Sequence, residues 1–215
     1  MPRTITVKGV GTASVKPDYI EITLNIISKE SKYSEAVNSA NVGIAALQKA
    51  ICSVGFAKEE LKTLNFQVNT NYENEEDHKG RYRRVFRGYV CSYRLKLGFD
   101  MDTELLSRTI GAIAECGADA GMSIGFTVKN PERVSEELLR SAAENARAKA
   151  EILCAASEAK LGELLSIDYN WSDINVYSAS VYAGKGEMER GITTPCFEPE
   201  DIKAQDSATF VWTII

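Results

Sequence analysis

The sequence predicts an α+β fold, and three observations support this class. Runs in which apolar and polar residues alternate indicate half-buried strands, and they recur along the whole chain. Between these runs lie segments with helical spacing of apolar residues, several of them ended by Gly. The chain has 215 residues and is 44% hydrophobic, which is enough apolar mass for a folded core. We expect a single domain over 1–215, or two tightly joined halves of about 1–100 and 101–215.

Two strands open the chain. Residues 3–9 alternate, and we expect Gly9 and Gly11 to break or bend this first strand. Residues 18–28 alternate over a longer run with large aliphatic side chains on one face, which predicts a half-buried strand. Asp18 follows a proline and is predicted to be a turn residue with a structural role.

A helix is predicted next, because apolar residues recur at helical spacing from Val37 to Val54. Ser31 or Ser34 is the expected N-cap. Gly55 stands where a left-handed residue usually ends a helix.

Residues 64–97 are predicted to form a long hairpin. Two alternating runs, 64–72 and 85–99, flank an acidic stretch that leads through Gly80. The second run is about 15 residues long, so we expect the hairpin to project beyond the core.

Two more helices follow, each with a local start signal. Asp102 is a good N-cap for a helix that reaches about Glu115, and Asn130 precedes a proline at the first position of a second helix. This second helix is Ala-rich and is predicted to run over about 131–160. An alternating strand at 122–128 separates the two helices.

The rest of the chain contains one long irregular segment between two strands. Residues 167–169 belong to a strand, residues 172–200 lose all periodicity, and residues 202–214 alternate as a C-terminal strand. We interpret 172–200 as a long loop that is disordered, forms a lid, or is an arm that docks on another subunit. The predicted order is β-β-α-β-β-α-β-α-β-β, arranged as mixed sheets with helices covering one face.

The sequence contains few residues that could form a catalytic or cofactor-binding site. His78 is the only histidine, which excludes a multi-histidine zinc site and leaves one residue for any Ser-His-Asp triad. Neither nucleotide-binding glycine motif is present in full. Carboxylate pairs such as Glu136 with Glu137, or Glu198 with Glu200, are the only basis for a hydrolase. We therefore expect no enzyme activity, no cofactor and no metal.

Cysteines and targeting signals bear on location. Five cysteines without a CxxC pair, in a chain with no visible signal peptide, indicate reduced thiols and a cytoplasmic location. A periplasmic or envelope location is expected if a leader has been removed. Cys52, Cys91, Cys116 and Cys154 lie on or near predicted apolar faces, so Cys196 is the expected exposed thiol. No run approaches the roughly 20 apolar residues of a membrane-spanning helix.

The segment 79–96 combines basic and aromatic residues. One interpretation is a surface for an anionic partner, with cations on phosphates and rings on bases. The other is a solvated strand whose cations pair with the acidic strand across the hairpin tip. The chain carries a net charge of −5, which makes nucleic acid an improbable partner. The candidate binding residues are Arg81, Tyr82, Arg83, Arg84, Arg87 and Tyr89.

An ordered set of residues resembles the SIMPL-domain proteins, a bacterial family formerly of unknown function. The opening pattern V-x-G-x-G, V-x-P-D and I is carried by Val7, Gly9, Gly11, Val15, Pro17, Asp18 and Ile22. Later similarities include Gly117-Ala118, Lys149-Ala150 and Leu161-Gly162, and the resemblance covers about residues 4–215. The resemblance implies an α+β fold and self-assembly into oligomers, and a periplasmic setting and a link to oxidative stress in several relatives.

Three functional interpretations follow. The first is a non-enzymatic SIMPL-like homo-oligomer linked to the stress response, which assembles through the hairpin 64–97 and the loop 172–200. The second is a binding module for nucleic acid or lipid that uses the basic segment 79–96. The third is a hydrolase built on carboxylates.

Overall fold

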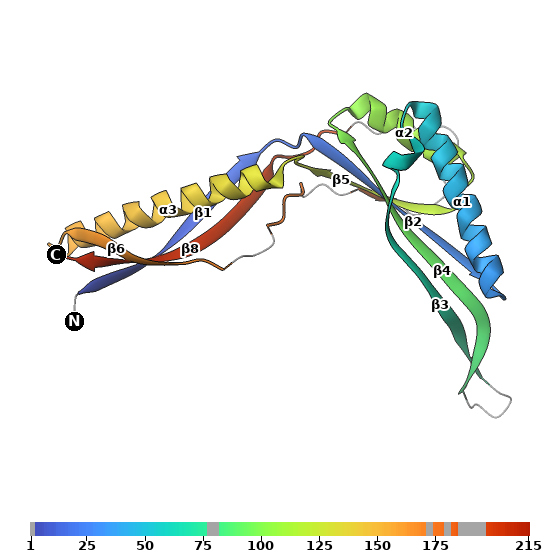
Figure 1. Ribbon diagram of the computed structural model, residues 1–215, viewed down its shortest axis with the longest axis horizontal. Coiled ribbons are helices and arrows are strands. Elements are labelled where there is room, and N and C mark those ends of the chain that lie inside the picture. The colour runs from blue at the N-terminus through green and yellow to red at the C-terminus, as the bar shows by residue number, and fades with distance from the viewer. Residues whose placement is uncertain (1–2, 77–81, 171–173, 179–181, 185–196) are drawn as a thin grey trace. The chain divides into compact units, whose positions relative to one another are not determined.

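The computed structural model describes residues 3–76, 82–170, 174–178, 182–184 and 197–215. The chain divides into two compact units, each of which is described by itself (Figure 1). Unit 1 comprises Met1–Asp18, Thr127–Ala179 and Pro199–Ile215, and unit 2 comprises Tyr19–Phe126 and Ser180–Glu198. Each unit contains one sheet and at least one helix, which confirms the α+β class.

Unit 1 is a three-stranded sheet covered by one helix. The strand order is β1-β8-β6, with β1 at Thr4–Val15, β8 at Ile202–Ile214 and β6 at Leu161–Asp168. Strands β1 and β8 come from the two ends of the described chain and pair antiparallel over their whole length. Helix α3, Pro131–Ala156, runs along β1 and β8 (Figure 1).

Strand β1 is continuous through Gly9 and Gly11, so the predicted break is wrong. Both glycines pair in register with β8. Their role is steric, because a Cβ on Gly9 would overlap the carbonyl oxygen of Ala142 in α3, and a Cβ on Gly11 would overlap that of Leu138. The buried face of α3 consists largely of alanines at this level, including Ala146. Small residues on both sides therefore let the helix backbone approach the strand backbone.

Helix α3 also covers the outer edge of β1 with polar side chains. The Val10 N–H donates to Asn145 Oδ1 at 3.0 Å, and the Thr12 N–H donates to Ser141 Oγ at 3.3 Å. These are backbone groups that a neighbouring strand would otherwise satisfy. The helix thus completes the hydrogen bonding of an edge strand as well as its apolar packing.

The start of α3 is confirmed, whereas its predicted end is four residues too late. Asn130 accepts a hydrogen bond from the Arg133 N–H, as expected of an N-cap. The helix ends at Ala156, and Glu158 adopts a left-handed backbone with φ 54°. The chain then turns so that Lys160 and Ile215 exchange two backbone hydrogen bonds, which starts β6 earlier than expected.

Asp18 has the structural role that the sequence predicts. Its backbone N–H donates to the Thr127 carbonyl at 3.1 Å. Its carboxylate Oδ1 accepts the Lys129 N–H at 2.7 Å. Asp18 therefore joins the connection between β1 and β2 to residues 127–129, which lead into α3.

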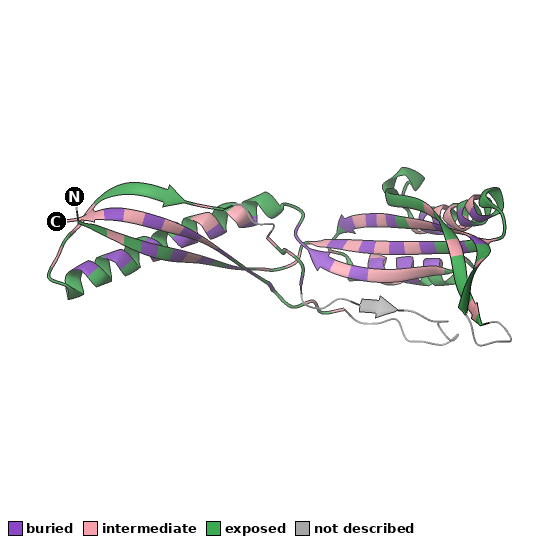
Figure 2. Cartoon of the chain, turned by 90° about the horizontal axis from the view of Figure 1, so that it is seen from below, coloured by how far each residue is buried: buried purple, intermediate pink, exposed green. Residues whose placement is uncertain are grey.

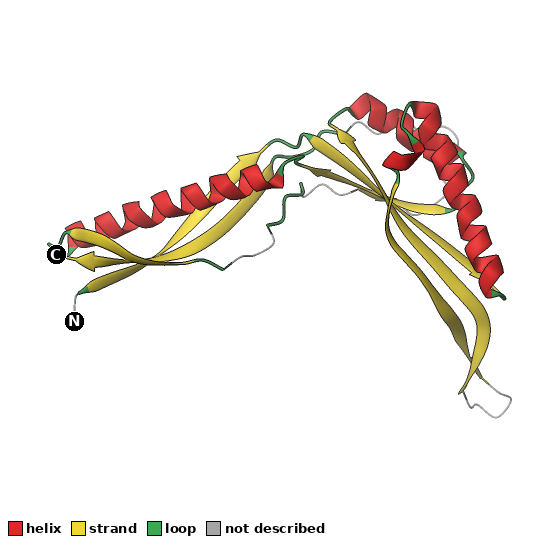
Figure 3. Cartoon of the chain, in the orientation of Figure 1, coloured by secondary structure: helices red, strands yellow, loops and turns green. Residues whose placement is uncertain are grey.

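Unit 2 is a five-stranded sheet in the order β3-β4-β2-β5-β7, with two helices packed on one core (Figure 3). The strands are β2 (Tyr19–Glu30), β3 (Lys62–Glu76), β4 (Tyr82–Asp100), β5 (Ala120–Thr127) and β7 (Tyr182–Gly184). The helices are α1 (Tyr33–Val54), α2 (Thr103–Glu115) and the short 3-10 helix η1 (Lys58–Glu60). The order β2-α1-β3-β4-α2-β5 is that of the split βαβ or ferredoxin-like motif.

We expected mixed sheets, but every strand pair whose residue register is described is antiparallel, in both units. The reason in unit 2 is topological. Strands β2 and β3, which flank α1, run the same way, but β4 lies between them. The crossover through α1 therefore skips one strand, and parallel strands are never neighbours there.

The core of unit 2 follows the predicted alternation. Ile20, Ile22 and Leu24 have no exposed surface, and buried residues alternate along the central strands (Figure 2). Helix α1 differs at its start, because Lys32 holds the N-cap position without a side-chain cap and Ser31 instead contacts Glu35. Its end is confirmed by Gly55, which is left-handed with φ 115°.

Most of the predicted loop 172–200 lies outside the described residues. Of its described part, Ile174 and Val176 pack on the core of unit 1. Residues 182–184 form β7, which pairs with β5 and was not predicted. Phe197 packs against Phe126 in unit 2, with ring centroids 5.9 Å apart.

The close approach of α3 to β1 generates the first prediction. Gly9→Ala or Gly11→Ala should lower the free energy of unfolding by roughly 3 kcal/mol, because the added methyl group meets helix backbone that cannot move aside. Urea unfolding measures the change. The control is Gly111→Ala in α2, where a Cβ meets nothing within 4 Å; helix propensity should make that variant about 0.8 kcal/mol more stable. Equal stability of all three variants would contradict the packing described.

Candidate functional site: the β3–β4 hairpin

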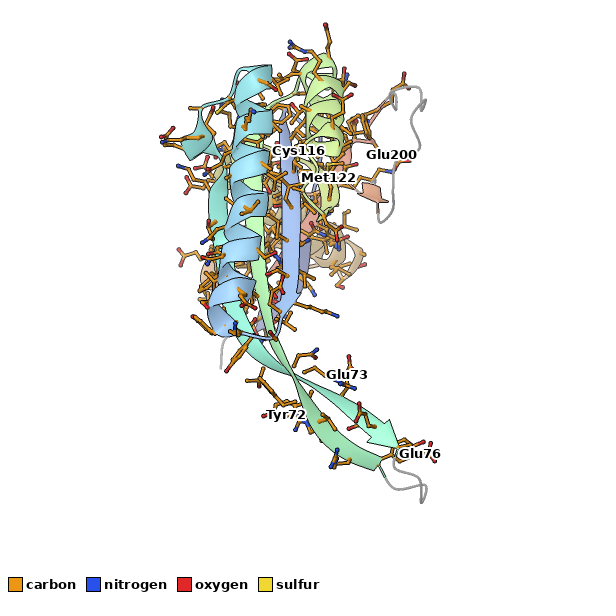
Figure 4. The ribbon with its side chains drawn as sticks, turned by 90° about the vertical axis from the view of Figure 1, so that its right-hand side faces the viewer. Tyr72, Glu73, Glu76, Cys116, Met122 and Glu200 are labelled. Carbon is orange, nitrogen blue, oxygen red and sulfur yellow. The ribbon has the colours of Figure 1, made fainter. Side chains whose placement is uncertain are left out.

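The β3–β4 hairpin extends past the sheet as a two-stranded ribbon. Strand β2 pairs with β4 only as far as Tyr89, which lies opposite Glu30. Beyond that point β4 pairs with β3 alone, over residues 71–76 and 82–88, and these residues are called the ribbon below. Figure 4 shows the ribbon projecting beyond α1, with Tyr72 and Glu73 on opposite sides. The predicted projection of the hairpin is confirmed.

A bulge marks the point where the ribbon leaves the sheet. Asn71 pairs with Gly88 and Tyr72 pairs with Phe86, so Arg87 is an extra residue on β4. Gly88 has φ +125°, and a Cβ there would overlap the carbonyl oxygen of Glu30. Only glycine combines this backbone conformation with this close contact to the end of β2.

The bulged Arg87 is paired with acidic residues of β3. Its Nε lies 3.1 Å from Glu73 Oε2, and its guanidinium also contacts Glu75. Because both carboxylates come from the facing strand, this cation takes part in the cross-strand pairing that the sequence left as one alternative. Such exposed pairs stabilise a ribbon by about 1 kcal/mol or less.

The other predicted binding residues are spread along the ribbon and its base. The Arg84 guanidinium lies over the Tyr72 ring at 4.4 Å, and Arg83 is opposite Glu75 in register. Tyr82 is 74% exposed at the described end of β4. Tyr89 lies at the base of the ribbon, and Arg81 is outside the described residues.

Six aromatic side chains form two groups of ring contacts along the hairpin and the start of α1, and the six together are called the aromatic row. Centroid distances are 4.6 Å for Phe66–Tyr93, 5.5 Å for Tyr72–Phe86, 5.5 Å for Phe86–Tyr89 and 5.8 Å for Tyr89–Tyr33. The Val68–Cys91 pair bridges the gap between Tyr93 and Tyr89.

Part of this row is exposed, which the sequence did not predict. Phe66 is 46% exposed, Phe86 45% and Tyr72 42%. Tyr93 is more enclosed; its hydroxyl donates to Asn41 Oδ1 at 3.3 Å, and burial raises its pKa. The alternation of β3 correctly placed Phe66 and Tyr72 on one face, but α1 covers that face over β2 and β4 and leaves β3 largely uncovered.

The outer edge of β3 is the second feature of the site. Within the described residues, no strand pairs with this side of β3, which is 15 residues long. The other edges are protected in recognised ways: α3 covers β1, β7 has 3 residues, and β6 has 8 residues with two register irregularities. Strand β3 also has two register shifts against β4, but at 15 residues it is the longest edge strand of the described structure, and no described helix or strand covers its outer side.

The predicted cysteine and carboxylate sites are dispersed. The sequence predicted Cys196 as the exposed thiol, but Cys52 on α1 is exposed as well. Cys196 itself lies outside the described residues. Cys91 is buried, and this burial raises its pKa. Glu136 and Glu137 are exposed on α3. The described residues hold no group of three His, Cys, Asp or Glu placed to bind a metal ion.

One buried carboxylate escaped the sequence analysis. Asp206 occupies the core-facing row of β8, and its Oδ2 accepts the Tyr169 hydroxyl at 2.8 Å. Its Oδ1 accepts the Ser207 N–H at 2.7 Å. The hydrogen bond to Asp206 raises the pKa of Tyr169. Because both carboxylate oxygens of Asp206 accept hydrogen bonds, its role is structural. The sequence contained a sign of it, namely an aspartate at an otherwise apolar position of the alternating strand.

The chain is similar to proteins of one bacterial family. The sequence model of the SIMPL family, described as a protein of unknown function (DUF541), matches residues 5–212. The 26 kDa periplasmic immunogenic proteins of Brucella melitensis and Brucella abortus are each 23% identical over 166 residues, 77% of this chain and 66% of theirs. The match thus spans just under two thirds of these relatives' length. Their names do not support the expected cytoplasmic location.

The chain also aligns with the solved structure of an uncharacterized conserved protein from Listeria innocua. It is 10% identical, with 95% of this chain and 92% of that chain covered and a TM-score of 0.22. A score this low carries no argument about this chain. Among the described helices, none is long and apolar enough to cross a membrane.

The bulge generates the second prediction. Gly88→Ala should lower the free energy of unfolding of unit 2 by roughly 2 kcal/mol, because alanine cannot take this φ beside Glu30 without strain. Hydrogen exchange should accelerate at residues 82–88. Gly121→Ala in β5 is the control, since its Cβ would lie 3.9 Å from the Asn25 carbonyl oxygen, an ordinary contact. Identical urea midpoints for the two variants would show that the bulge is not needed.

Proposed function

The chain belongs to the SIMPL family, and we propose that it works without catalysis, as a homo-oligomer that assembles through the outer edge of β3. One observation carries the proposal, namely the 15-residue edge strand that no described strand covers. A long edge presents unpaired N–H and C=O groups, and a second chain is a ready partner for them. The stress-response role implied by the resemblance is part of the same proposal, with the oligomer as its working form.

The side chains of β3 favour a protein partner at this edge. Leu64 and Phe66 are 52% and 46% exposed, and they are apolar. Edge strands that must stay single usually carry lysines, prolines or an inward-pointing charge. From Thr63 to Tyr72, β3 has no charged residue and no proline. This stretch therefore lacks the residues that discourage pairing.

Location is a separate part of the proposal. The Brucella relatives are named as periplasmic proteins, and we propose a periplasmic or envelope-associated setting for this chain. Fractionation of the source cells with an antibody to the protein tests it. Recovery with the cytoplasmic markers would overturn this part and leave the assembly proposal unaffected.

A lysine on the β3 edge supplies the third prediction. Light scattering of the unmodified protein should give a mass of at least twice the 23.6 kDa of one chain. Thr70→Lys should reduce that mass at a given concentration by shifting the equilibrium toward monomer, because pairing would bury the added charge. Val42→Lys is the control, since Val42 is 72% exposed on α1, away from β3. A monomeric unmodified protein, or equal dissociation of both variants, would count against β3 as the assembly edge.

Binding of an anionic partner is the second candidate function. It is favoured by the exposed Tyr82 and by Arg84, whose guanidinium lies on an aromatic ring at the ribbon. The ion pairs of Arg87 with Glu73 and Glu75 weaken it, because they neutralise a cation that a phosphate would need.

The fourth prediction tests that candidate. If the ribbon binds anions, the protein should bind single-stranded nucleic acid or anionic vesicles with an affinity that falls as salt rises. Replacing Arg81, Arg83, Arg84 and Arg87 with Ser should then remove the salt-sensitive binding. The control replaces four exposed cations of α3, Arg133, Arg140, Arg147 and Lys149. Absence of salt-dependent binding by the unmodified protein ends this candidate.

A further inference from the structure

We propose that two copies of the chain pair their β3 strands antiparallel about a two-fold axis at Asn69, so that Phe66 of each copy meets Tyr72 of the other. The inference rests on the proposed self-assembly and deepens it by naming the partner, a second copy, and the register. Three properties of β3 support it: the alternation of its side chains, the distribution of its charges, and the position of its bulge.

The two faces of β3 differ in chemistry. Phe66, Val68, Thr70 and Tyr72 alternate onto the face that carries the aromatic row. The residues between them are amides that point to the opposite face, where the Gln67 side-chain amide lies 3.3 Å from Asn69 Oδ1. A two-fold axis perpendicular to the sheet places the aromatic face of one copy beside the aromatic face of the other. Even-numbered residues then lie opposite even-numbered residues, and odd-numbered residues opposite odd-numbered ones.

With the axis at Asn69, aromatic residues lie opposite aromatic residues, β-branched opposite β-branched, and amides opposite polar side chains over residues 65–73. The opposed pairs are Asn65 with Glu73, Phe66 with Tyr72, Gln67 with Asn71, Val68 with Thr70, and Asn69 with its own copy. Directly opposed aromatic and β-branched pairs are the ones that stabilise an antiparallel sheet. No two charged residues of the same sign oppose each other in this register.

Neighbouring registers lose these matches. An axis at Thr70 would oppose Phe66 to Asn74, and an axis at Asn74 would oppose Glu73 to Glu75, two like charges. An axis moved to Val68 would bring Leu64 opposite Tyr72. Leu64 is the extra residue of a bulge in β3, since Thr63 and Asn65 pair with consecutive residues of β4, and this bulge interrupts a regular ladder.

The register also joins two ring contacts that each copy already makes. Phe66 packs on Tyr93 at 4.6 Å, and Tyr72 packs on Phe86 at 5.5 Å. Opposing Phe66 to Tyr72 would connect these pairs into one band of rings across the two copies. The exposed part of the aromatic row would thereby be covered at the same time as the backbone edge.

Cysteine cross-linking in the full chain tests the register as the fifth prediction. Cys52, Cys116 and Cys196 are first replaced by Ser, so that the buried Cys91 and Cys154 are the native thiols that remain. Asn69→Cys places two thiols directly opposite each other on the face away from the aromatic row. It should form an intermolecular disulfide about tenfold faster than Gln67→Cys or Asn71→Cys alone, because pairing raises the effective thiol concentration.

Mixing differently tagged Gln67→Cys and Asn71→Cys proteins provides the matched control. This mixture should yield the mixed disulfide in excess of either homodimer, because the register opposes these two positions. Equal rates at all three positions, in a protein that light scattering shows to be multimeric, would overturn the register and leave self-assembly standing. A monomeric parent protein with no disulfide above the random-collision rate would overturn both.

Discussion

The hydrogen bonding of strand edges is the constraint on which the rest of this structure depends. Each outer strand leaves a row of backbone N–H and C=O groups that need partners or protection. In unit 1, α3 meets this need for β1, since Asn145 and Ser141 accept its outward N–H groups. That solution requires the helix to lie close to the strand, which explains Gly9 and Gly11. In unit 2 the described residues show no equivalent cover over β3, and the proposed function follows from that difference.

Local signals in the sequence predicted most elements of the fold, whereas contacts between distant segments did not follow from it. The N-caps Asp102 and Asn130 were identified correctly, because a cap depends on the next three residues alone. Gly9 was interpreted as a strand breaker, because its actual role depends on a helix more than 130 residues later. The end of α3 was missed because a residue other than glycine, Glu158, takes the left-handed conformation that follows it.

The candidate site was predictable in its residues and only partly in its geometry. The acidic stretch before the tip and the basic stretch after it made cross-strand pairing a clear alternative, and Arg87 with Glu73 realises it. The exposure of Phe66 was not foreseen, because alternation defines a face without showing what covers it. The bulge at Arg87 was equally hidden, although Gly88 beside it was a usable signal.

Hydrogen exchange of the β3 amides distinguishes assembly through β3 from assembly through another surface. Residues 65–73, whose outward N–H groups lack a described strand partner, should become protected as protein concentration rises, while β4 stays protected throughout. The protection should appear over the same concentration range in which the light-scattering mass increases. Rapid exchange of the outward β3 amides in a fully multimeric sample would contradict pairing through β3, because the copies would then be joined through another surface.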